Sequence, residues 1–187
     1  MHAVQAEGLQ GDAFTNMFTM MQSLLAIGNA HQPQEPFSWN QINDTFGWTT
    51  EHHTFVKHLL SDVRCDVNLV DDRGDTALIR AIEAPMTEDD KSAAIVRLLL
   101  SHPRTDVNKR NRDGGSALHA ACGYFTNSVG AKLLLADARC DVNLRDKKGR
   151  TALMAAVRWV KVSDDKYANA IRLLLNRPDV DVNAADE

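Results

Sequence analysis

The sequence writes nearly the same phrase four times, and this repetition limits the folds open to the chain. In the copy LLLSHPRTDVN, residues 98–108, Leu100 lies eight residues before Asn108, which follows an Asp-Val pair. The other copies are residues 59–68, 133–143 and 173–183. Their final asparagines, Asn68, Asn108, Asn143 and Asn183, are separated by 40, 35 and 40 residues. A period in this range predicts a row of stacked structural repeats.

A second block keeps register with the first. Six residues after each of the first three asparagines comes a glycine, then two residues later a Thr or Ser followed by Ala-Leu, and finally an alanine. We expect the glycine in a turn at positive φ, the hydroxyl as a helix N-cap, the leucine inside and the alanine at a close helix contact. The sets are Gly74, Thr76, Leu78 and Ala81; Gly114, Ser116, Leu118 and Ala121; and Gly149, Thr151, Leu153 and Ala156.

The leucine run predicts a second helix in each unit. Ile95, Leu98 and Leu99 have the i, i+3, i+4 spacing of one helix face, and Ile171, Leu174 and Leu175 repeat it. Each unit then reads as hairpin, helix, turn, helix, and no unit can bury its apolar face alone. Burying one leucine stabilises a fold by roughly 1.5–3 kcal/mol. We therefore expect Leu100→Ala or Leu135→Ala to destabilise the fold more than any surface substitution.

The combined pattern resembles the ankyrin repeat, whose signature runs DxxGxTPLHxAA, IVxLLL and ADVN. The resemblance covers residues 55–187. Alanine replaces the family's usual proline at positions 77, 117 and 152, and only His119 keeps the signature histidine. The resemblance implies an all-α ankyrin-repeat solenoid of helix-turn-helix repeats joined by β-hairpin-like loops, acting as a protein–protein interaction module.

The organisation expected along the chain has six parts. Residues 1–37 form a helical N-terminal cap and connector, because Asp12 to Gly28 carries its apolar residues on one helical face. That methionine-rich face could instead bind a partner. Residues 38–68 read as a degenerate first repeat whose helix begins at Thr50. The full repeats are 69–108, 109–143 and 144–183, and residues 184–187 are the start of a further hairpin or the chain end.

Composition excludes several classes of protein. The net charge of −4 indicates neither a nucleic-acid binder nor a membrane-surface protein. Residues 1–56 contain no Lys or Arg and so lack the basic start of a secretory signal. The three cysteines have no metal-binding or redox spacing, and Cys65 and Cys140 occupy equivalent places as small semi-buried fillers. We expect a monomer in the cytoplasm, a reducing compartment.

No catalytic motif is present. The sequence has no GxGxxG, GxxxxGK, HExxH or GxSxG, so we expect neither an enzyme nor a cofactor. His52, His53 and His58 do not have the i, i+4 spacing of a metal pair on a helix, so no metal site is expected.

The resemblance implies that partners bind at hairpin tips and on the inner, concave face of the first helices. The charges of the tips change along the row, from an acidic first tip (Asp71, Asp72, Asp75) to a basic third tip, which predicts a polarised groove. The positions carried over as partner-binding are Asp72, Arg73, Asp75, Glu83, Arg112, Tyr124, Lys147, Lys148, Arg150, Arg158 and Trp159.

The most specific hypothesis is that Arg158 and Trp159 bind an acidic or aromatic segment of the partner protein. The alternative is that Trp159 packs under the long turn between the two helices of its repeat. Two further possibilities follow from the family resemblance. The asparagines Asn68, Asn108, Asn143 and Asn183 resemble substrates of asparaginyl hydroxylases, although a structural role is favoured. If the chain is a fragment, the repeats could be the substrate-recruiting arm of a larger enzyme or of a microbial effector in a host cell.

Overall fold

The computed structural model describes residues 50–62, 65–83, 91–124, 128–159 and 165–186. Contacts divide the chain into two compact units, residues 1–37 and 38–187, and every described residue lies in the second. The predicted N-terminal cap, including the helix expected over 12–28, lies outside the described residues. So does most of the degenerate repeat before Thr50.

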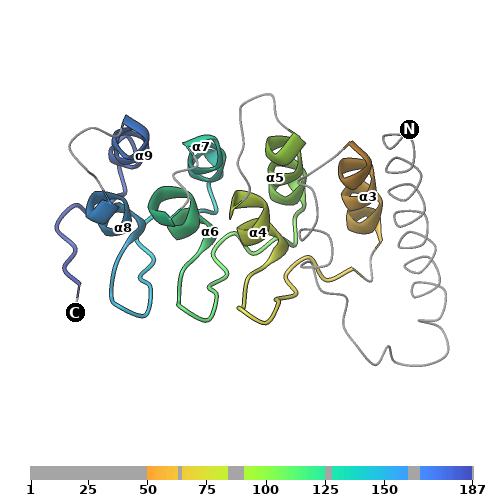
Figure 1. Ribbon diagram of the computed structural model, residues 1–187, viewed down its shortest axis with the longest axis horizontal. Coiled ribbons are helices and arrows are strands. Elements are labelled where there is room, and N and C mark those ends of the chain that lie inside the picture. Colours follow the sequence, from red (N-terminus) through yellow and green to blue (C-terminus); the bar gives the residue numbers. More distant parts are fainter. Residues whose placement is uncertain (1–49, 63–64, 84–90, 125–127, 160–164, 187) are drawn as a thin grey trace, which may run out of the picture. The chain divides into compact units, whose positions relative to one another are not determined.

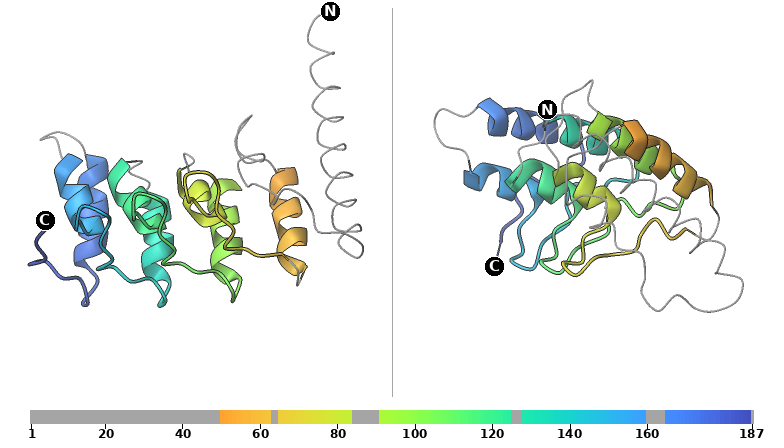
Figure 2. Two further views of the ribbon diagram at one scale, coloured as in Figure 1. Left: turned by 90° about the horizontal axis from the view of Figure 1, so that it is seen from below. Right: turned by 45° about the vertical axis from the view of Figure 1, so that its right-hand side comes forward.

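Pairs of short helices make up the described unit (Figures 1 and 2). We call residues 69–108, 109–143 and 144–183 repeats 1, 2 and 3. The first helices α4, α6 and α8 lie in one layer, the second helices α5, α7 and α9 lie in another with α3, and the hairpin loops all project from one side. The bounds are α3 Thr50–Ser61, α4 Ala77–Glu83, α5 Lys91–Ser101, α6 Ala117–His119, η1 Ala120–Tyr124, α7 Ser128–Ala136, α8 Ala152–Trp159 and α9 Asp165–Leu175. The segment η1 continues α6 with π-helical hydrogen bonding.

The hairpin loops are not strands. In the described part of the chain the pairing is limited to one isolated bridge, Val70 with Thr76, so the fold is all-α as predicted. Each turn contains a glycine at positive φ, +78° at Gly74 and Gly114 and +72° at Gly149, which confirms that prediction. A Cβ at Gly114 would lie 2.6 Å from the backbone nitrogen of Lys147 in the next turn. Glycine is therefore needed both for the turn and for the approach of the next repeat.

The predicted caps form in two ways. The Thr76 hydroxyl accepts the backbone N–H of Ile79 at 3.3 Å, and the Thr151 hydroxyl accepts that of Met154 at 3.4 Å. At Ser116 the contact is reversed, because its backbone N–H donates to Nδ1 of His119 at 3.3 Å. Each arrangement satisfies a backbone donor at the start of a helix that would otherwise lack a partner.

The core lies between the two helix layers. The leucine nine residues before each asparagine is buried in every copy: Leu59 is 6% exposed, and Leu99, Leu134 and Leu174 are 0% exposed. Of the last leucines that we singled out, Leu135 is 9% exposed, Leu100 is half-buried and Leu175 is 51% exposed.

Asparagine side chains join each repeat to the next. The Asn108 amide nitrogen donates to the Arg139 carbonyl at 2.8 Å, and its oxygen accepts the Asp141 N–H at 2.9 Å. The same pair of bonds is made by Asn68, to Arg104 and Asp106, and by Asn143, to Asp179 and Asp181. These bonds give the asparagines the structural role that was favoured. Whether they are hydroxylated stays a prediction.

No helix among the described residues is both long enough and apolar enough to span a bilayer.

Candidate partner-binding groove

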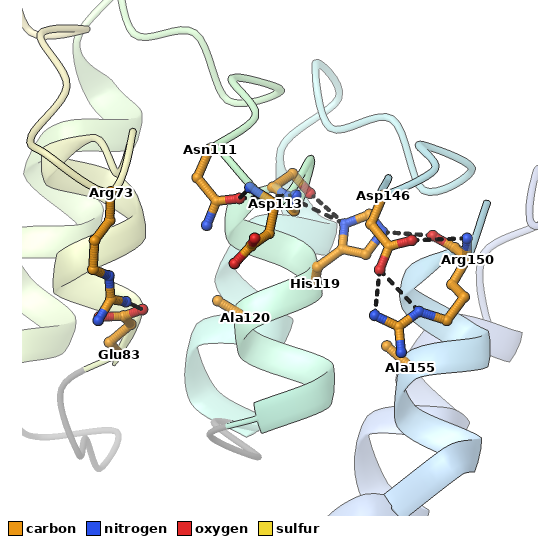
Figure 3. Close-up of a pocket in the computed structure, with 11 residues that line it drawn as sticks. Arg73, Glu83, Asn111, Asp113, His119, Ala120, Asp146, Arg150 and Ala155 are labelled. Atoms are coloured by element: carbon orange, nitrogen blue, oxygen red, sulfur yellow. Dashed lines mark hydrogen bonds and ion pairs between the residues drawn. The ribbon is translucent and has the colours of Figure 1, made fainter. Parts of the chain in front are cut away.

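A groove of about 390 Å³ lies on the face made by the hairpins and the first helices (Figure 3). Repeat 1 forms one wall, and Asp146 and Arg150 of repeat 3 form the other. The floor is made by repeat 2 together with Ala155 of repeat 3. The lining residues are Arg73, Glu83, Asn111, Asp113, Gly115, Ser116, His119, Ala120, Asp146, Arg150 and Ala155.

A network of carboxylates and guanidinium groups builds the repeat 1 wall. Arg80 bonds Asp71 at 2.7 Å and Glu83 at 3.0 Å. Arg73 bonds Asp75 at 3.0 Å and Glu83 at 2.9 Å, although its side chain is 60% exposed. Burial raises the pKa of Glu83, and the two arginines only partly oppose this shift. The network holds this wall rigid and leaves Arg73 as its solvent-facing member.

Small residues open the floor. Arg80, Ala120 and Ala155 are equivalent, because each lies four residues after the capping Thr or Ser. In repeat 1 the Arg80 side chain occupies this position and is only 14% exposed. In repeats 2 and 3 alanines stand at this position and line the groove. In repeat 3 the Arg150 guanidinium lies beside Ala155 and pairs with Asp146, as Figure 3 shows. The open part of the groove therefore begins after repeat 1.

His119 lies under the groove and connects repeats 2 and 3. Its Nδ1 accepts the Ser116 N–H at 3.3 Å and lies 2.9 Å from the Ser116 hydroxyl, while Nε2 lies 3.0 Å from the Arg150 carbonyl. Because Nδ1 accepts, Nε2 carries the proton and donates to Arg150. Burial lowers the pKa of His119, and the bond to the Arg150 carbonyl opposes this shift without overcoming it. The imidazole is thus a neutral structural bridge.

An ion pair forms the far wall. The Arg150 Nε donates to the Asp146 carboxylate at 2.9 Å, as Figure 3 shows. Burial alone would raise the pKa of Asp146, but hydrogen bonds from Arg150 and from the Lys148 N–H outweigh it and lower the pKa. The Arg150 guanidinium is therefore held by an ion pair within its own hairpin.

The hairpin tips form the rim of the groove. Backbone bonds fix their spacing, because the Arg112 N–H donates to Arg73 O at 3.0 Å and the Lys147 N–H donates to Asp113 O at 3.0 Å. Arg112, Lys147 and Lys148 are exposed, and no side-chain hydrogen bond or ion pair is recorded for them within the described ranges. We call these three residues the basic rim.

The structure changes the expected charge pattern at the first tip. Asp75 is 0% exposed and Asp71 is 8% exposed, because both carboxylates serve the repeat 1 network, so neither can contact a partner directly. Of the three acids only Asp72 is exposed. Asp75 therefore holds the wall instead of binding, and the free charge of the rim is dominated by the basic residues of repeats 2 and 3.

The predicted aromatic sites stay predictions. Trp159 and Tyr124 end α8 and η1, and their side chains lie outside the described residues. Arg158 is exposed on α8 and borders a second depression of about 350 Å³ at the repeat 3 end of the row. Leu153, which was expected to point fully inward, also lines this depression and is only half-buried.

Sequence reasoning missed two structural features of the groove. The first is a turn residue three positions after each of the asparagines that join the repeats: Asp71, Asn111 and Asp146. One side-chain oxygen of each accepts two backbone N–H groups of its own turn. An acid or amide at this fixed offset was the available signal. The second feature is Arg80, which bounds the groove at repeat 1. It was missed because it was not compared with Ala120 and Ala155, the residues at the equivalent positions of repeats 2 and 3.

Two features of the structure concern metal binding and thiol reactivity. The described residues contain no group of three or more His, Cys, Asp or Glu side chains that could hold a metal ion. Burial raises the pKa of the Cys122 thiol to about 12 and that of Cys140 to about 11, so neither is a thiolate at neutral pH. What the face does offer is an apolar floor between charged walls.

Comparisons with known proteins agree with this architecture. The sequence matches the family model for ankyrin repeats (3 copies) over residues 48–124 and 86–186. The ankyrin repeat protein EF0377 is 26% identical with a TM-score of 0.57; the match covers 73% of this chain and only 61% of that one. An ankyrin repeat domain from Acinetobacter baumannii AYE, ABAYE2397, is 21% identical with a TM-score of 0.59, covering 96% of this chain and 85% of that one. No curated protein matches the sequence.

Proposed function

This chain belongs to the ankyrin repeat family, whose members are generally protein–protein interaction modules, and from that premise we propose that it binds a partner protein in the groove and on the basic rim. The observation that carries the proposal is the groove with its border of exposed cations, for which no side-chain partner is recorded among the described residues. Apolar floors with a charged border are typical of recognition sites.

The free charge of the rim favours an acidic partner segment. The tips carry three exposed cations, Arg112, Lys147 and Lys148, and two exposed acids, Asp72 and Asp113. The carboxylates of the walls are paired with arginines. Long-range attraction then speeds the encounter with an anionic segment and disfavours a cationic one. Arg158, exposed on α8, extends the same charge toward the repeat 3 end.

We further propose that the module is non-catalytic and works as a monomer in a reducing compartment. Cys65, Cys122 and Cys140 are all free thiols, and two are buried in the core, where they pack as small apolar groups. A disulfide framework would be expected of a secreted chain of small repeats.

The test blocks the groove with a side chain that repeat 1 already carries at the equivalent position. Ala120→Arg places in repeat 2 the side chain that fills the same position in repeat 1, and Lys147→Glu with Lys148→Glu reverses the rim. The control is Asn169→Arg, which adds the same arginine on the exposed surface of α9. Partner capture and affinity are measured with each variant, and circular dichroism checks folding.

We expect both groove variants to lose captured proteins that the wild type and the control retain. Capture that survives both groove variants unchanged would refute the proposal. A folded Ala120→Arg variant is expected, because an arginine at this position is already accommodated in repeat 1.

A further inference from the structure

Asp113 differs from the other charged residues that line the groove. Arg73 bonds Glu83 at 2.9 Å in one wall, and Arg150 bonds Asp146 at 2.9 Å in the other. The Asp113 carboxylate is exposed, and no hydrogen bond or ion pair is recorded for it within the described ranges. The groove therefore holds a negative charge that no described side chain neutralises.

The equivalent positions in repeat 1 explain why Asp113 has no counter-ion in its own repeat. Asp113 holds the place of Arg73, because each lies five residues after the final asparagine of the preceding copy. In repeat 1 the charged side chains of residues 75, 80 and 83 form the ionic network with Arg73. The residues at the corresponding positions of repeat 2 are Gly115, Ala120 and Gly123. None of these positions supplies a charge that could pair with Asp113.

Both neighbouring repeats place a guanidinium at the first helix. In repeat 1, Arg80 is only 14% exposed and bonds two carboxylates of its own repeat. In repeat 3, the Arg150 guanidinium lies beside Ala155 and bonds a carboxylate of its hairpin. The positions of these two arginines are alanine and glycine in repeat 2. Figure 3 shows the Asp113 carboxylate directed from its hairpin toward Ala120, so a guanidinium from outside would complete there the arrangement that its neighbours already have.

The backbone holds Asp113 in place before any partner binds. Its N–H donates to the Asn111 side-chain oxygen at 3.0 Å, and its carbonyl accepts the Lys147 N–H at 3.0 Å. A carboxylate on a fixed turn binds a cation without ordering a loop, which keeps the entropic cost of binding low. Arginine suits this site better than lysine, because a planar guanidinium can form two parallel charge-assisted hydrogen bonds with one carboxylate.

We infer that Asp113 is a specificity-determining residue that selects a partner segment carrying an arginine, whose guanidinium enters the groove beside Ala120. The inference rests on the proposed function, in which acidic residues of the same segment contact the basic rim. The arginine then fixes the position of that segment along the row of repeats, because repeat 2 is the repeat that lacks a guanidinium of its own at the first helix.

The probes are short labelled acidic peptides that differ only at one central residue, which is arginine in one peptide and citrulline in the other. Citrulline keeps the shape of arginine but carries no charge. The basic rim alone would favour the citrulline peptide, because its net charge is more negative, whereas Asp113 favours the arginine peptide. We expect fluorescence anisotropy with the whole chain to show about tenfold tighter binding of the arginine peptide, which corresponds to about 1.4 kcal/mol.

Asp113→Asn removes the charge at nearly constant shape, and it should leave the citrulline peptide as the tighter ligand. Ala120→Arg supplies the guanidinium from the chain itself and should also remove the arginine preference. The control is Asp72→Asn, which removes the same charge from an exposed tip residue that is not among those lining the groove, and it should keep the preference. Circular dichroism checks that each variant is folded.

Tighter or equal binding of the citrulline peptide by the wild type would overturn the inference, as would no binding of either peptide. An arginine preference that persists in Asp113→Asn would also overturn it. Partner capture judges the proposed function separately. Capture that is lost on Lys147→Glu with Lys148→Glu but unchanged by Asp113→Asn would refute this inference and leave the proposed function standing.

Discussion

Asn68, Asn108 and Asn143 form an asparagine ladder, in which each side chain bonds the backbone of the following repeat. Replacing Asn108 by alanine should measure how strongly this ladder joins two repeats. The side chain makes two bonds to repeat 2, one to the Arg139 carbonyl at 2.8 Å and one from the Asp141 N–H at 2.9 Å. Alanine removes both and leaves two backbone groups that must find water. The bond between the Asn108 backbone N–H and the Asp106 carboxylate, at 3.0 Å, does not need the amide and survives.

The expected loss follows from these two bonds. A typical intramolecular hydrogen bond contributes about 0.5–1.5 kcal/mol to stability. The pair therefore contributes about 1–3 kcal/mol, because the site is half-buried and water can partly replace the lost partners. For a domain of this size each kcal/mol lowers the melting temperature by about 2–4 °C. We expect Asn108→Ala to lower it by about 2–12 °C, and urea unfolding followed by circular dichroism gives the free energy directly.

Asn183 is the matched control. It holds the same place in repeat 3 and keeps the backbone bond to Asp181 at 3.0 Å, but in the described part of the chain no bond of its amide to a further repeat is recorded. Asn183→Ala should therefore change stability by less than about 0.5 kcal/mol. Equal losses for Asn108→Ala and Asn183→Ala would refute the reasoning, because the ladder would then contribute nothing beyond the local turn.

Three further predictions concern the core, the histidine and the thiols. Leu99→Ala should cost about 2–5 kcal/mol because Leu99 is fully buried, whereas Leu175→Ala, at a 51% exposed site, should cost less than about 1 kcal/mol in the same urea experiment. Because burial lowers the pKa of His119, the unfolded chain takes up a proton at this residue before the folded chain does as the pH falls below about 6.5. The free energy of unfolding should therefore decrease on acidification toward pH 5. His119→Ile, which introduces the residue found at this position in repeat 1, should flatten this pH dependence, and an unchanged slope would contradict the prediction. Alkylation of the native protein at pH 8 followed by mass spectrometry should modify the half-buried Cys65 before Cys122, whose pKa burial raises to about 12, and early labelling of Cys122 would show that the core opens.

The leucine runs show what the spacing of apolar residues can predict and what it cannot. Their spacing correctly predicted a helix in each repeat, but it did not say which leucine of a run is fully buried. Leu99 and Leu100 are neighbours in the same run, yet only Leu99 is fully buried. A helical pattern defines a broad apolar face, and the partner helices decide which part of that face loses all contact with water.

The partner-binding residues show the same division. Family resemblance singled out Arg73, Glu83 and Arg150, and all three line the groove. It also placed Asp75 there, although that carboxylate is buried beneath the network. Arg73 and Asp75 are two positions apart in one turn, and both are charged, so the sequence does not distinguish them. The direction of each side chain in the folded turn decides which of them reaches solvent.

The sequence by itself determined the local structure and the repeat register. Gly74, Gly114 and Gly149 require turns at positive φ, and the capping hydroxyls start helices, because backbone sterics and hydrogen bonding act within a few residues. Tertiary structure alone decided where the groove opens. Arg80 closes repeat 1 by pairing with carboxylates from its hairpin and its helix, whereas the equivalent residues Ala120 and Ala155 line the groove. The shape of a surface depends on which side chains from separate segments meet, and that meeting is fixed only when the repeats stack.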